Sequence, residues 1–411
     1  MFLDPHSSSD ASHLIDPSVL DVHAPDHLNR KGPKHGIQLS QKDASAILSR
    51  FAPGAILTSY KVSTRGYNNR LYYLTAKLPS ISEGERAVET SVKEAEAEEE
   101  YIIKVCGRYW HRTKTETEVV GIWLANAHAH LPTPMIREWD ADGTEFGVEY
   151  TAMPQLPGSP LNLVWKHLAG KGKKSILKQL AEMVVQFKTK ISSGVLPQGK
   201  IGNWVAEAVW EDGRAKRLGG FDVGPTLDGE GPWRTYKAYL RTQLDKQLRI
   251  ARRQPVLEGM RVVWPRVEKL LEKLDEDETI VDDTSFVFTH GDLDAQNILV
   301  EYNDISSDTP TITAILDWEW SGMFPAEEEY FASYQFLEHD PSFFYSMLEE
   351  GGVQTPRTIP HYRQRKLLYD IKENIAPWFL TDHSEPGGEE VRKEVEIAKK
   401  ILEDCLEKLG Y

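Results

Sequence analysis

Two aspartates and an asparagine in the C-terminal half of the chain could do chemistry together. Asp292 and Asn297 are close in the run Thr-His-Gly-Asp-Leu-Asp-Ala-Gln-Asn, and Asp317 follows after a polar insertion. Carboxylate and amide oxygens are hard ligands that suit Mg²⁺, which proteins hold through one or two such oxygens together with substrate phosphates and water. A further carboxylate beside the ion could accept a proton from an attacking hydroxyl. Each residue alone could be an ordinary turn or strand-end residue, but the set in this order predicts phosphoryl transfer.

Three short apolar runs flank these side chains and would hold them in place. These runs are rich in β-branched and aromatic residues, which predicts three strands: Phe286–Phe288, Ile298–Val300 and Ile312–Leu316. Gly291 lets the chain turn after the first run, so the first aspartate and the asparagine would lie at the two ends of one tight loop. The third run ends directly before Asp317, which could then face that loop.

A second group of candidates lies between residues 55 and 106. Two strand-like runs, Ala55–Thr64 and Leu71–Leu78, are separated by a turn that contains Gly66 and Asn69. A glycine lets the backbone approach a phosphate closely, although most glycines at such turns only close a hairpin. Lys104 lies in a further predicted strand, where it would either point outward along the sheet or bind a phosphate.

A helix is predicted to begin near Thr113, and it could carry a carboxylate partner for Lys104. Thr113-x-x-Glu116 and Thr115-x-x-Glu118 both fit the capping-box pattern. Apolar residues then recur at helical spacing. The residues themselves leave open whether Glu116 or Glu118 would pair with the lysine.

The run His290-Gly-Asp292-x-x-x-x-Asn297, followed by Ile-Leu-Asp317 after a hairpin, resembles the aminoglycoside phosphotransferase family. That family shares the protein-kinase-like fold and is also similar to choline kinases. The resemblance implies that Asp292 is the catalytic base, that Asn297 and Asp317 bind Mg²⁺, and that His290 supports the loop. It also implies ATP as the phosphoryl donor and a hydroxyl group of a small molecule as the acceptor.

The same resemblance extends to the N-terminal half. Gly66 and Asn69 match the family's Gly-x-x-Asn-x-x-Tyr loop over the nucleotide, and Lys104 matches the strand lysine that holds the α- and β-phosphates. Glu118 is favoured as the partner of this lysine because Thr-Glu-Val resembles the family's Asn-Glu-Val. Glu116 remains a competitor.

A predicted strand at Phe146–Met153 runs into a segment that resembles the hinge between the lobes of this fold. Backbone groups of the hinge meet the adenine edge, which makes Met153 and Leu156 candidates for nucleotide binding. Pro154 departs from the family, which more often has an acidic residue there. A proline has no amide N–H, so the donor must come from elsewhere, such as Leu156, and the preference for ATP or GTP stays open.

These patterns predict an α+β, two-lobed protein-kinase-like fold. Residues 1–39 are rich in Ser, Asp, His and Pro and predict a disordered or loosely attached tail. The N-terminal nucleotide-binding lobe is expected at 40–153, as a small antiparallel β-sheet with one helix. Ser40 would cap a short helix before it, and a Ser/Glu-rich insertion at 79–100 is expected to be solvated. The mainly helical C-terminal catalytic and acceptor-binding lobe is expected at 154–411.

Helical periodicity recurs through the predicted C-terminal lobe. The predicted helices are 161–168, 175–191, 236–252, 257–274, 326–336, 362–379 and 388–409. Between residues 201 and 232 a Gly/Pro-rich insert interrupts them, and it resembles an insert of fungal members of the family. It could shape the acceptor pocket or simply cover a helix pair.

The acceptor is the least determined part of the prediction. Only about eight residues separate Asp317 from Pro325, whereas a protein kinase needs a longer segment to seat a polypeptide. Glu319 and Glu327–Glu329 could attract a cationic amine, or they could be acidic first turns of a helix. The alternatives are a catalytically silent nucleotide-binding scaffold and, less favoured, a protein kinase.

Composition excludes several classes of protein. The 411 residues carry a net charge of −15, which argues against nucleic-acid binding. The two cysteines cannot form a disulfide framework or a zinc site, no apolar run approaches a membrane span, and no signal peptide is evident. The chain is therefore expected to be cytoplasmic, with no membrane, nucleic-acid or protein partner evident.

Overall fold

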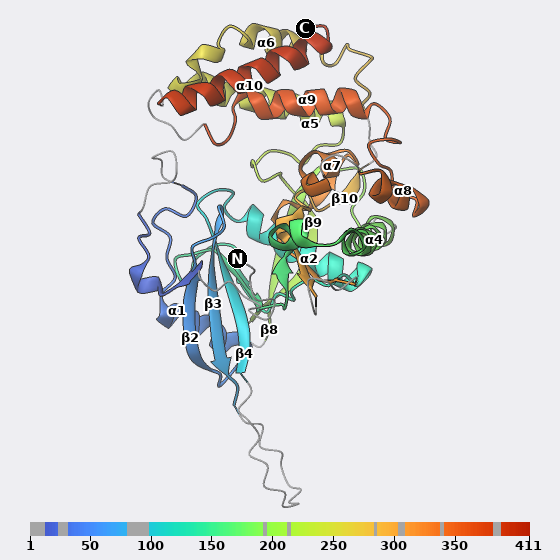
Figure 1. Cartoon of the computed structure of the whole chain (residues 1–411). Helices are drawn as coiled ribbons and strands as arrows, with labels where there is room; N and C mark the ends of the chain where they lie inside the picture. Colours follow the sequence, from blue (N-terminus) through green and yellow to red (C-terminus); the bar gives the residue numbers. More distant parts are fainter. Residues whose placement is uncertain are drawn as a thin grey trace, which may run out of the picture.

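The chain folds into two lobes, and a layer of helices covers the far end of the larger one (Figure 1). The computed structural model describes residues 13–23, 32–79, 98–191, 195–211, 215–282, 286–302, 309–337, 341–380 and 388–411. Most of the Ser/Glu-rich insertion predicted at 79–100 lies outside these residues.

A six-stranded antiparallel sheet forms the smaller lobe, in the order β1-β2-β3-β4-β6-β5. Its strands are β1 (Leu14–Ile15), β2 (Ile56–Ser63), β3 (Asn69–Lys77), β4 (Glu98–Cys106), β5 (Glu138–Asp140) and β6 (Tyr150–Pro154). Helix α1 (Gln41–Phe51) packs across the sheet and contacts β2 and β5, and α2 (Thr113–Ala129) lies between the sheet and the larger lobe (Figure 1). Helix α2 contacts β5 and β6 of the sheet.

The two helices of this lobe begin differently. Ser40 caps α1 as predicted, because its Oγ accepts a hydrogen bond from the N–H of Asp43 at 3.1 Å. The capping boxes predicted for α2 are wrong. Arg112 occupies the cap position with φ +66° and makes no side-chain cap. Thr113 and Thr115 therefore lie inside the helix, where the hydroxyl of Thr115 donates to the buried carboxylate of Glu149.

The prediction of a loosely attached tail is wrong for residues 13–23 and 32–39. Strand β1 extends the sheet by pairing with β2. The guanidinium of Arg70 donates to the carbonyls of Ile37 and Lys34, at 2.7 and 3.1 Å. Burial of Arg70 requires acceptors, and this segment provides them, which composition alone does not reveal.

Two small antiparallel sheets strengthen the larger lobe. Three strands form one sheet: β7 (Ser159–Pro160), β11 (Ile298–Glu301) and β12 (Thr311–Ile315). Four form the other, in the order β10-β13-β8-β9: β10 (Val287–Thr289), β13 (Gly322–Phe324), β8 (Gly202–Glu211) and β9 (Ala215–Val223). The strands predicted around the candidate site are confirmed as β10, β11 and β12.

The hairpin of β8 and β9 replaces part of the predicted Gly/Pro-rich insert. Its glycines allow close packing across the hairpin. A Cβ on Gly219 would lie 2.2 Å from the side chain of Val209, and one on Gly224 would lie 2.3 Å from that of Val205. In the sequence these glycines predicted a loop, but in the structure they allow the two strands of the hairpin to pack closely.

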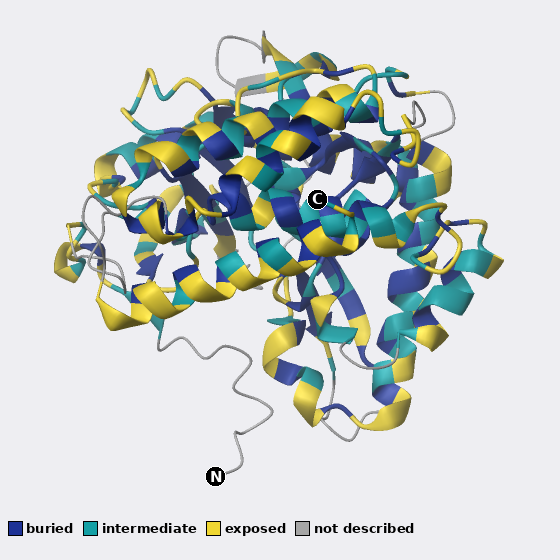
Figure 2. Cartoon of the chain, turned by 90° about the horizontal axis from the view of Figure 1, so that it is seen from above, coloured by how far each residue is buried: buried dark blue, intermediate teal, exposed yellow. Residues whose placement is uncertain are grey.

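The larger lobe is mainly helical, as predicted. Its helices are α3 (Leu161–Val164), α4 (Gly170–Gln186), α5 (Tyr236–Arg253), α6 (Trp264–Lys273), α7 (Glu328–Ala332), α8 (Ser342–Glu350), α9 (Tyr362–Ile375) and α10 (Glu389–Lys408). The single helix predicted over 257–274 is divided into a 3₁₀ segment at Pro255–Met260 and α6, because Pro265 starts a new helix rather than continuing one. Helices α5, α6, α9 and α10 form the outer layer, along which buried and exposed residues alternate (Figures 1 and 2).

An aromatic cluster joins the elements beneath the candidate site. Trp318 lies 5.9 Å from Phe288 and 6.1 Å from Phe187 between ring centroids, and Trp204 of the hairpin packs 5.8 Å from Phe288. All four side chains are fully buried. The ends of β10 and β12 are thereby fixed relative to α4. None of the helices in the described part of the chain combines the length and apolarity needed to cross a membrane.

Candidate active site

The loop between β10 and β11 brings two predicted site residues into contact. Asn297 donates from Nδ2 to the carbonyl of Asp292 at 2.8 Å and to its Oδ2 at 3.0 Å. Gly291 has φ +81°, and a Cβ there would lie 2.8 Å from the carbonyl oxygen of Trp320. The glycine is needed both for the left-handed turn and for this close approach.

Asp317 reaches the same volume from the end of β12. Its backbone is left-handed, with φ +63°, and the preceding N–H of Leu316 donates to the carbonyl of Asn297 at 2.8 Å. An aspartate in this conformation is uncommon and strained. The strain points its carboxylate toward the smaller lobe, where Oδ1 accepts from Nζ of Lys104 at 2.6 Å.

Three carboxylates surround the amine of Lys104. Nζ lies 2.7 Å from Glu118, 2.6 Å from Asp317 and 2.9 Å from Glu319. Of the two predicted partners on α2, Glu118 makes the contact, whereas Glu116 accepts from the N–H of Ala206. Sequence reasoning did not place Glu319 here, although its position two residues after Asp317 was a usable signal.

The predicted glycine loop approaches this cluster through Asn69. Its Nδ2 donates to Oε2 of Glu319 at 2.8 Å, which ties the start of β3 to the larger lobe. Gly66 has φ +83°, and its carbonyl accepts from Lys34 of the N-terminal segment. The site therefore combines residues from β3, β4, α2, the β10–β11 loop and the end of β12.

The two predicted adenine-contacting residues lie on the connection between the lobes. Met153 is buried in β6 opposite Ile102, two positions along β4 from Lys104. Leu156 follows β6 and is half-buried. The connection is held by Thr313, whose hydroxyl donates to the carbonyl of Pro157 at 2.7 Å. The structure thus does not bring Met153 and Leu156 into contact with the carboxylate cluster, and their role stays a prediction.

A buried ion pair supports the loop from behind, and sequence reasoning missed it. Glu329 accepts from the N–H groups of His290 at 2.9 Å and Gly291 at 3.3 Å, and from Nζ of Lys188 at 2.7 Å. His290 Nε2 lies 3.0 Å from the carbonyl of Leu316. Burial lowers the pKa of His290 to about 4, so the imidazole is neutral and structural. The sequence signal for this ion pair was Lys188, a lysine on the buried side of the predicted helix 175–191.

Burial and neighbouring negative charge oppose the ionisation of Asp292 and Asp317. Burial, and then the nearby charge of Asp317, raise the pKa of Asp292 to about 7. Burial, and then Glu319, also raise the pKa of Asp317. Burial opposes the charge of Lys104, but Asp317 and Glu118 raise its pKa well above the usual value. Two carboxylates that oppose each other's ionisation form a site that a cation would stabilise.

These donors fit a hard divalent cation. Asp292 contacts Asn297 and lies close enough to Asp317 for its charge to raise the pKa of Asp292, and carboxylate and amide oxygens are the ligands Mg²⁺ prefers. Across the described ranges, no group of three His, Cys, Asp or Glu side chains forms a metal site by itself. Mg²⁺ bound at these residues would thus depend on the amide and on phosphate oxygens of a substrate.

Comparison with known proteins identifies the family. The model of the Phosphotransferase enzyme family matches residues 78–368, which is most of the chain. The chain belongs to this family. None of the curated proteins matches it.

Solved structures of similar fold agree with this membership. A candidate aminoglycoside phosphotransferase from Ralstonia eutropha JMP134 gives a TM-score of 0.52 at 15% identity, over 90% of this chain and 99% of that one. The gentamicin complex of APH(2")-IIa gives 0.52 at 11% identity, over 89% and 99%. The streptomycin–ATP complex of the same enzyme gives 0.50 at 10% identity, over 89% and 97%. At such identities the likeness concerns the fold, and it confirms the predicted kinase-like architecture.

Within this phosphotransferase fold, three of the four acidic residues Glu319 and Glu327–Glu329 form contacts inside the protein. Glu319 binds Lys104 and Asn69, and Glu329 binds Lys188. Glu327 forms a buried ion pair with an arginine of α9. Glu328 and Glu329 lie in the first turn of α7, as one alternative predicted. Glu319, Glu327 and Glu329 in addition hold the fold together through buried ion pairs, which leaves them less able to attract an amine.

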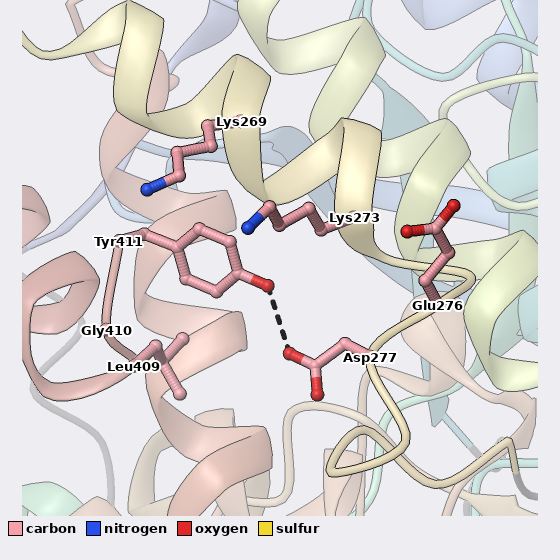
Figure 3. A pocket seen from close by; sticks show the side chains of 7 residues that line it. All are labelled: Lys269, Lys273, Glu276, Asp277, Leu409, Gly410 and Tyr411. Atoms are coloured by element: carbon pink, nitrogen blue, oxygen red, sulfur yellow. Dashed lines mark hydrogen bonds between the residues drawn. The ribbon is translucent and has the colours of Figure 1, made fainter.

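A separate open hollow lies far along the chain from these residues, between the end of α6 and the C-terminal residues (Figure 3). Its lining is mostly charged and polar: Lys269, Lys273, Glu276, Asp277, Leu409, Gly410 and Tyr411. The hydroxyl of Tyr411 donates to Asp277 at 3.0 Å. It contains none of the candidate site residues.

Proposed function

We propose that this member of the phosphotransferase family is a small-molecule kinase that transfers the γ-phosphoryl group of ATP to a hydroxyl group. The observation that carries the proposal is the convergence of Lys104, Glu118, Asp292, Asn297 and Asp317 from both lobes. Phosphoryl transfer depends mainly on positioning and on neutralising charge, and these side chains are suited to both tasks.

Each residue has a distinct part in this mechanism. Lys104, held by Glu118, orients the α- and β-phosphates. Asn297 and Asp317 would hold Mg²⁺, and the bound ion would neutralise the negative charge of the phosphates. Asp292, oriented by Asn297, accepts the proton of the acceptor hydroxyl. The nucleotide would be covered by the remaining predicted residues: Gly66, Asn69, Met153 and Leu156.

The acceptor is proposed to be a small hydroxylated molecule. Asp317 is followed by a 3₁₀ turn at Trp318–Trp320 and then directly by β13, which pairs with β10. This leaves no long segment to seat a polypeptide, which disfavours a protein kinase. Gentamicin and streptomycin, named in the similar complexes, are examples of hydroxylated amines to test, as are choline-like amines. Sugars and specialised metabolites are further acceptors to test, and membership of the fungal type and a cytoplasmic location also belong to the proposal.

An ADP-release screen over hydroxylated metabolites tests the proposal. Asp292→Asn serves as the blank, because loss of a positioned base is expected to cost about 10²–10⁴ in rate. Nucleotide binding by this variant should be retained. Wild-type rates in Asp292→Asn would show that the base is misassigned. Retained Mg-ATP binding with no turnover of any acceptor would favour the nucleotide-binding scaffold instead.

A further inference from the structure

The amine of Lys104 is saturated in this structure. An ammonium group has three donors, and three carboxylates lie within hydrogen-bonding distance: Glu118, Asp317 and Glu319. If Lys104 binds nucleotide phosphates, as the proposed function requires, at least one carboxylate must leave. Glu118 lies on α2 with its other oxygen bound to Thr151, and Asp317 is the proposed metal ligand.

Glu319 is the carboxylate that binds the groups proposed to hold a phosphate of the nucleotide. It bridges Lys104 and Asn69, both of which are proposed to meet the phosphates, at 2.9 and 2.8 Å. Its side chain is 1% exposed. A buried carboxylate that accepts from two phosphate-binding groups resembles the ligand in charge and in hydrogen bonding.

A second lysine beside Glu319 has no acceptor. Lys114, one turn before Glu118 on α2, is 1% exposed, and its Nζ has no hydrogen-bond partner among the described residues. It lies 6.0 Å from the ring of Trp110, which packs 4.8 Å from Trp320, the neighbour of Glu319. Burial opposes the charge of Glu319, but Lys104 and then Lys114 lower its pKa, although no ion pair joins Lys114 to Glu319 in the described part of the chain. A buried ammonium left without an acceptor is costly and calls for an explanation.

We propose that Glu319 is an exchangeable internal substitute for phosphate, which moves from Lys104 and Asn69 to Lys114 when the nucleotide binds. The exchange gives Lys114 the acceptor it lacks and frees two groups for the phosphates. It also keeps Glu319 paired, since a buried carboxylate that lost Lys104 with no other cation nearby would be strongly unfavourable. This inference rests on the proposed function and assigns Lys114 a positioning role that acts through Glu319.

A double-mutant cycle of nucleotide binding tests the exchange. Dissociation constants for ADP and a non-hydrolysable ATP analogue are measured with Mg²⁺ for the wild type, Lys114→Met, Glu319→Gln and the double variant. Lys114→Met should weaken binding at least about tenfold, because Glu319 then has no second cation. Glu319→Gln should bind as tightly as the wild type or tighter. The double variant should bind within about threefold of Glu319→Gln, as a coupled pair requires.

Two results would overturn the exchange. If Lys114→Met weakens binding equally in both backgrounds, the lysine binds phosphate directly. If Glu319→Gln alone weakens Mg-dependent nucleotide binding, the carboxylate is needed in the nucleotide-bound state. This second result can be obtained even if the Lys114→Met variant fails to fold.

Lys178→Met, on the exposed face of α4, is the control and should leave nucleotide binding unchanged. A wild type that binds no nucleotide would contradict the proposed function itself, a different outcome from either.

Discussion

At the scale of single residues, the negative charge of Asp292, the proposed base, is unfavourable in the folded protein. Its pKa of about 7 in the folded protein lies above the ordinary 3.8, because of burial and of Asp317. A raised folded pKa means that folding favours the protonated acid. The resulting stability is present below about pH 4 and is lost as the pH rises through 7.

Asp292→Asn should therefore stabilise the metal-free protein at high pH only. Because a change of one in pKa corresponds to about 1.4 kcal/mol, a gain of at least ~1 kcal/mol in the free energy of unfolding is expected at pH 8, and none at pH 4. Urea denaturation in the presence of a chelator measures both. Asp245→Asn on the exposed face of α5 is the control, since its surface ion pair is worth little. Equal effects at the two pH values would contradict the assigned cause.

Residue types and spacing predicted that Asp292, Asn297 and Asp317 would meet, because the proposed chemistry needs oxygen donors at the ends of short strands. The structure brings these three residues together, and their roles stay a proposal. Glu319 and Lys114 were not predicted, because their importance depends on which partners they meet across the lobes. Such partners are up to 250 residues away in sequence, as for Asn69 and Glu319, and no local pattern records them.

At the scale of elements, the turn that ends α4 supports the loop that carries Asp292. After Gln186 the helix widens into a π turn, Phe187–Ile191, which carries Lys188 toward β10. Lys188 donates to the carbonyl of Phe288 and to Glu329, each at 2.7 Å. π turns are rare and concentrate at functional sites. Here the turn delivers a cation to the carboxylate that holds the backbone of the loop bearing Asp292.

Lys188→Met should destabilise the protein strongly and reveal this support. Removing one partner of a buried ion pair leaves an uncompensated charge and costs about 3–5 kcal/mol. Combining it with Glu329→Gln removes that charge, so the double variant should be more stable than Lys188→Met alone. Urea denaturation of both at pH 7 gives the comparison. A double variant less stable than the single one would show that Glu329 does not depend on Lys188.

The elements themselves were predictable where periodicity was long and unbroken. Helices α5, α9 and α10 and strands β2 to β4 follow the expected patterns closely. The hairpin of β8 and β9 was not predicted, because glycines such as Gly224 favour a loop in sequence but permit tight sheet packing in space. The short helix α8 and the split before α6 are likewise set by tertiary packing and by a proline.

At the scale of the whole molecule, the N-terminal segment supports the smaller lobe. It supplies β1, the acceptors for the buried guanidinium of Arg70, and the carbonyl of Pro33 that accepts from the N–H of Arg108 at 2.9 Å. Lys34 also binds the carbonyl of Gly66 in the proposed phosphate loop. The segment thus connects to both ends of the loop between β2 and β3.

Removal of residues 1–38 should therefore weaken both folding and nucleotide binding. Arg70 is 6% exposed, and a buried charged group that loses its acceptors costs at least about 1–3 kcal/mol. The phosphate loop would lose part of its preorganisation, so affinity for ATP should fall by about threefold or more. Thermal unfolding and titration with a fluorescent ATP analogue measure the two effects. Removal of residues 1–12 alone keeps every contact named above and serves as the control. Because the long truncation touches neither Lys104 nor Asp292, unchanged stability and affinity would mean that the segment merely rests on the sheet, and that the glycine loop is ordered by the strands alone.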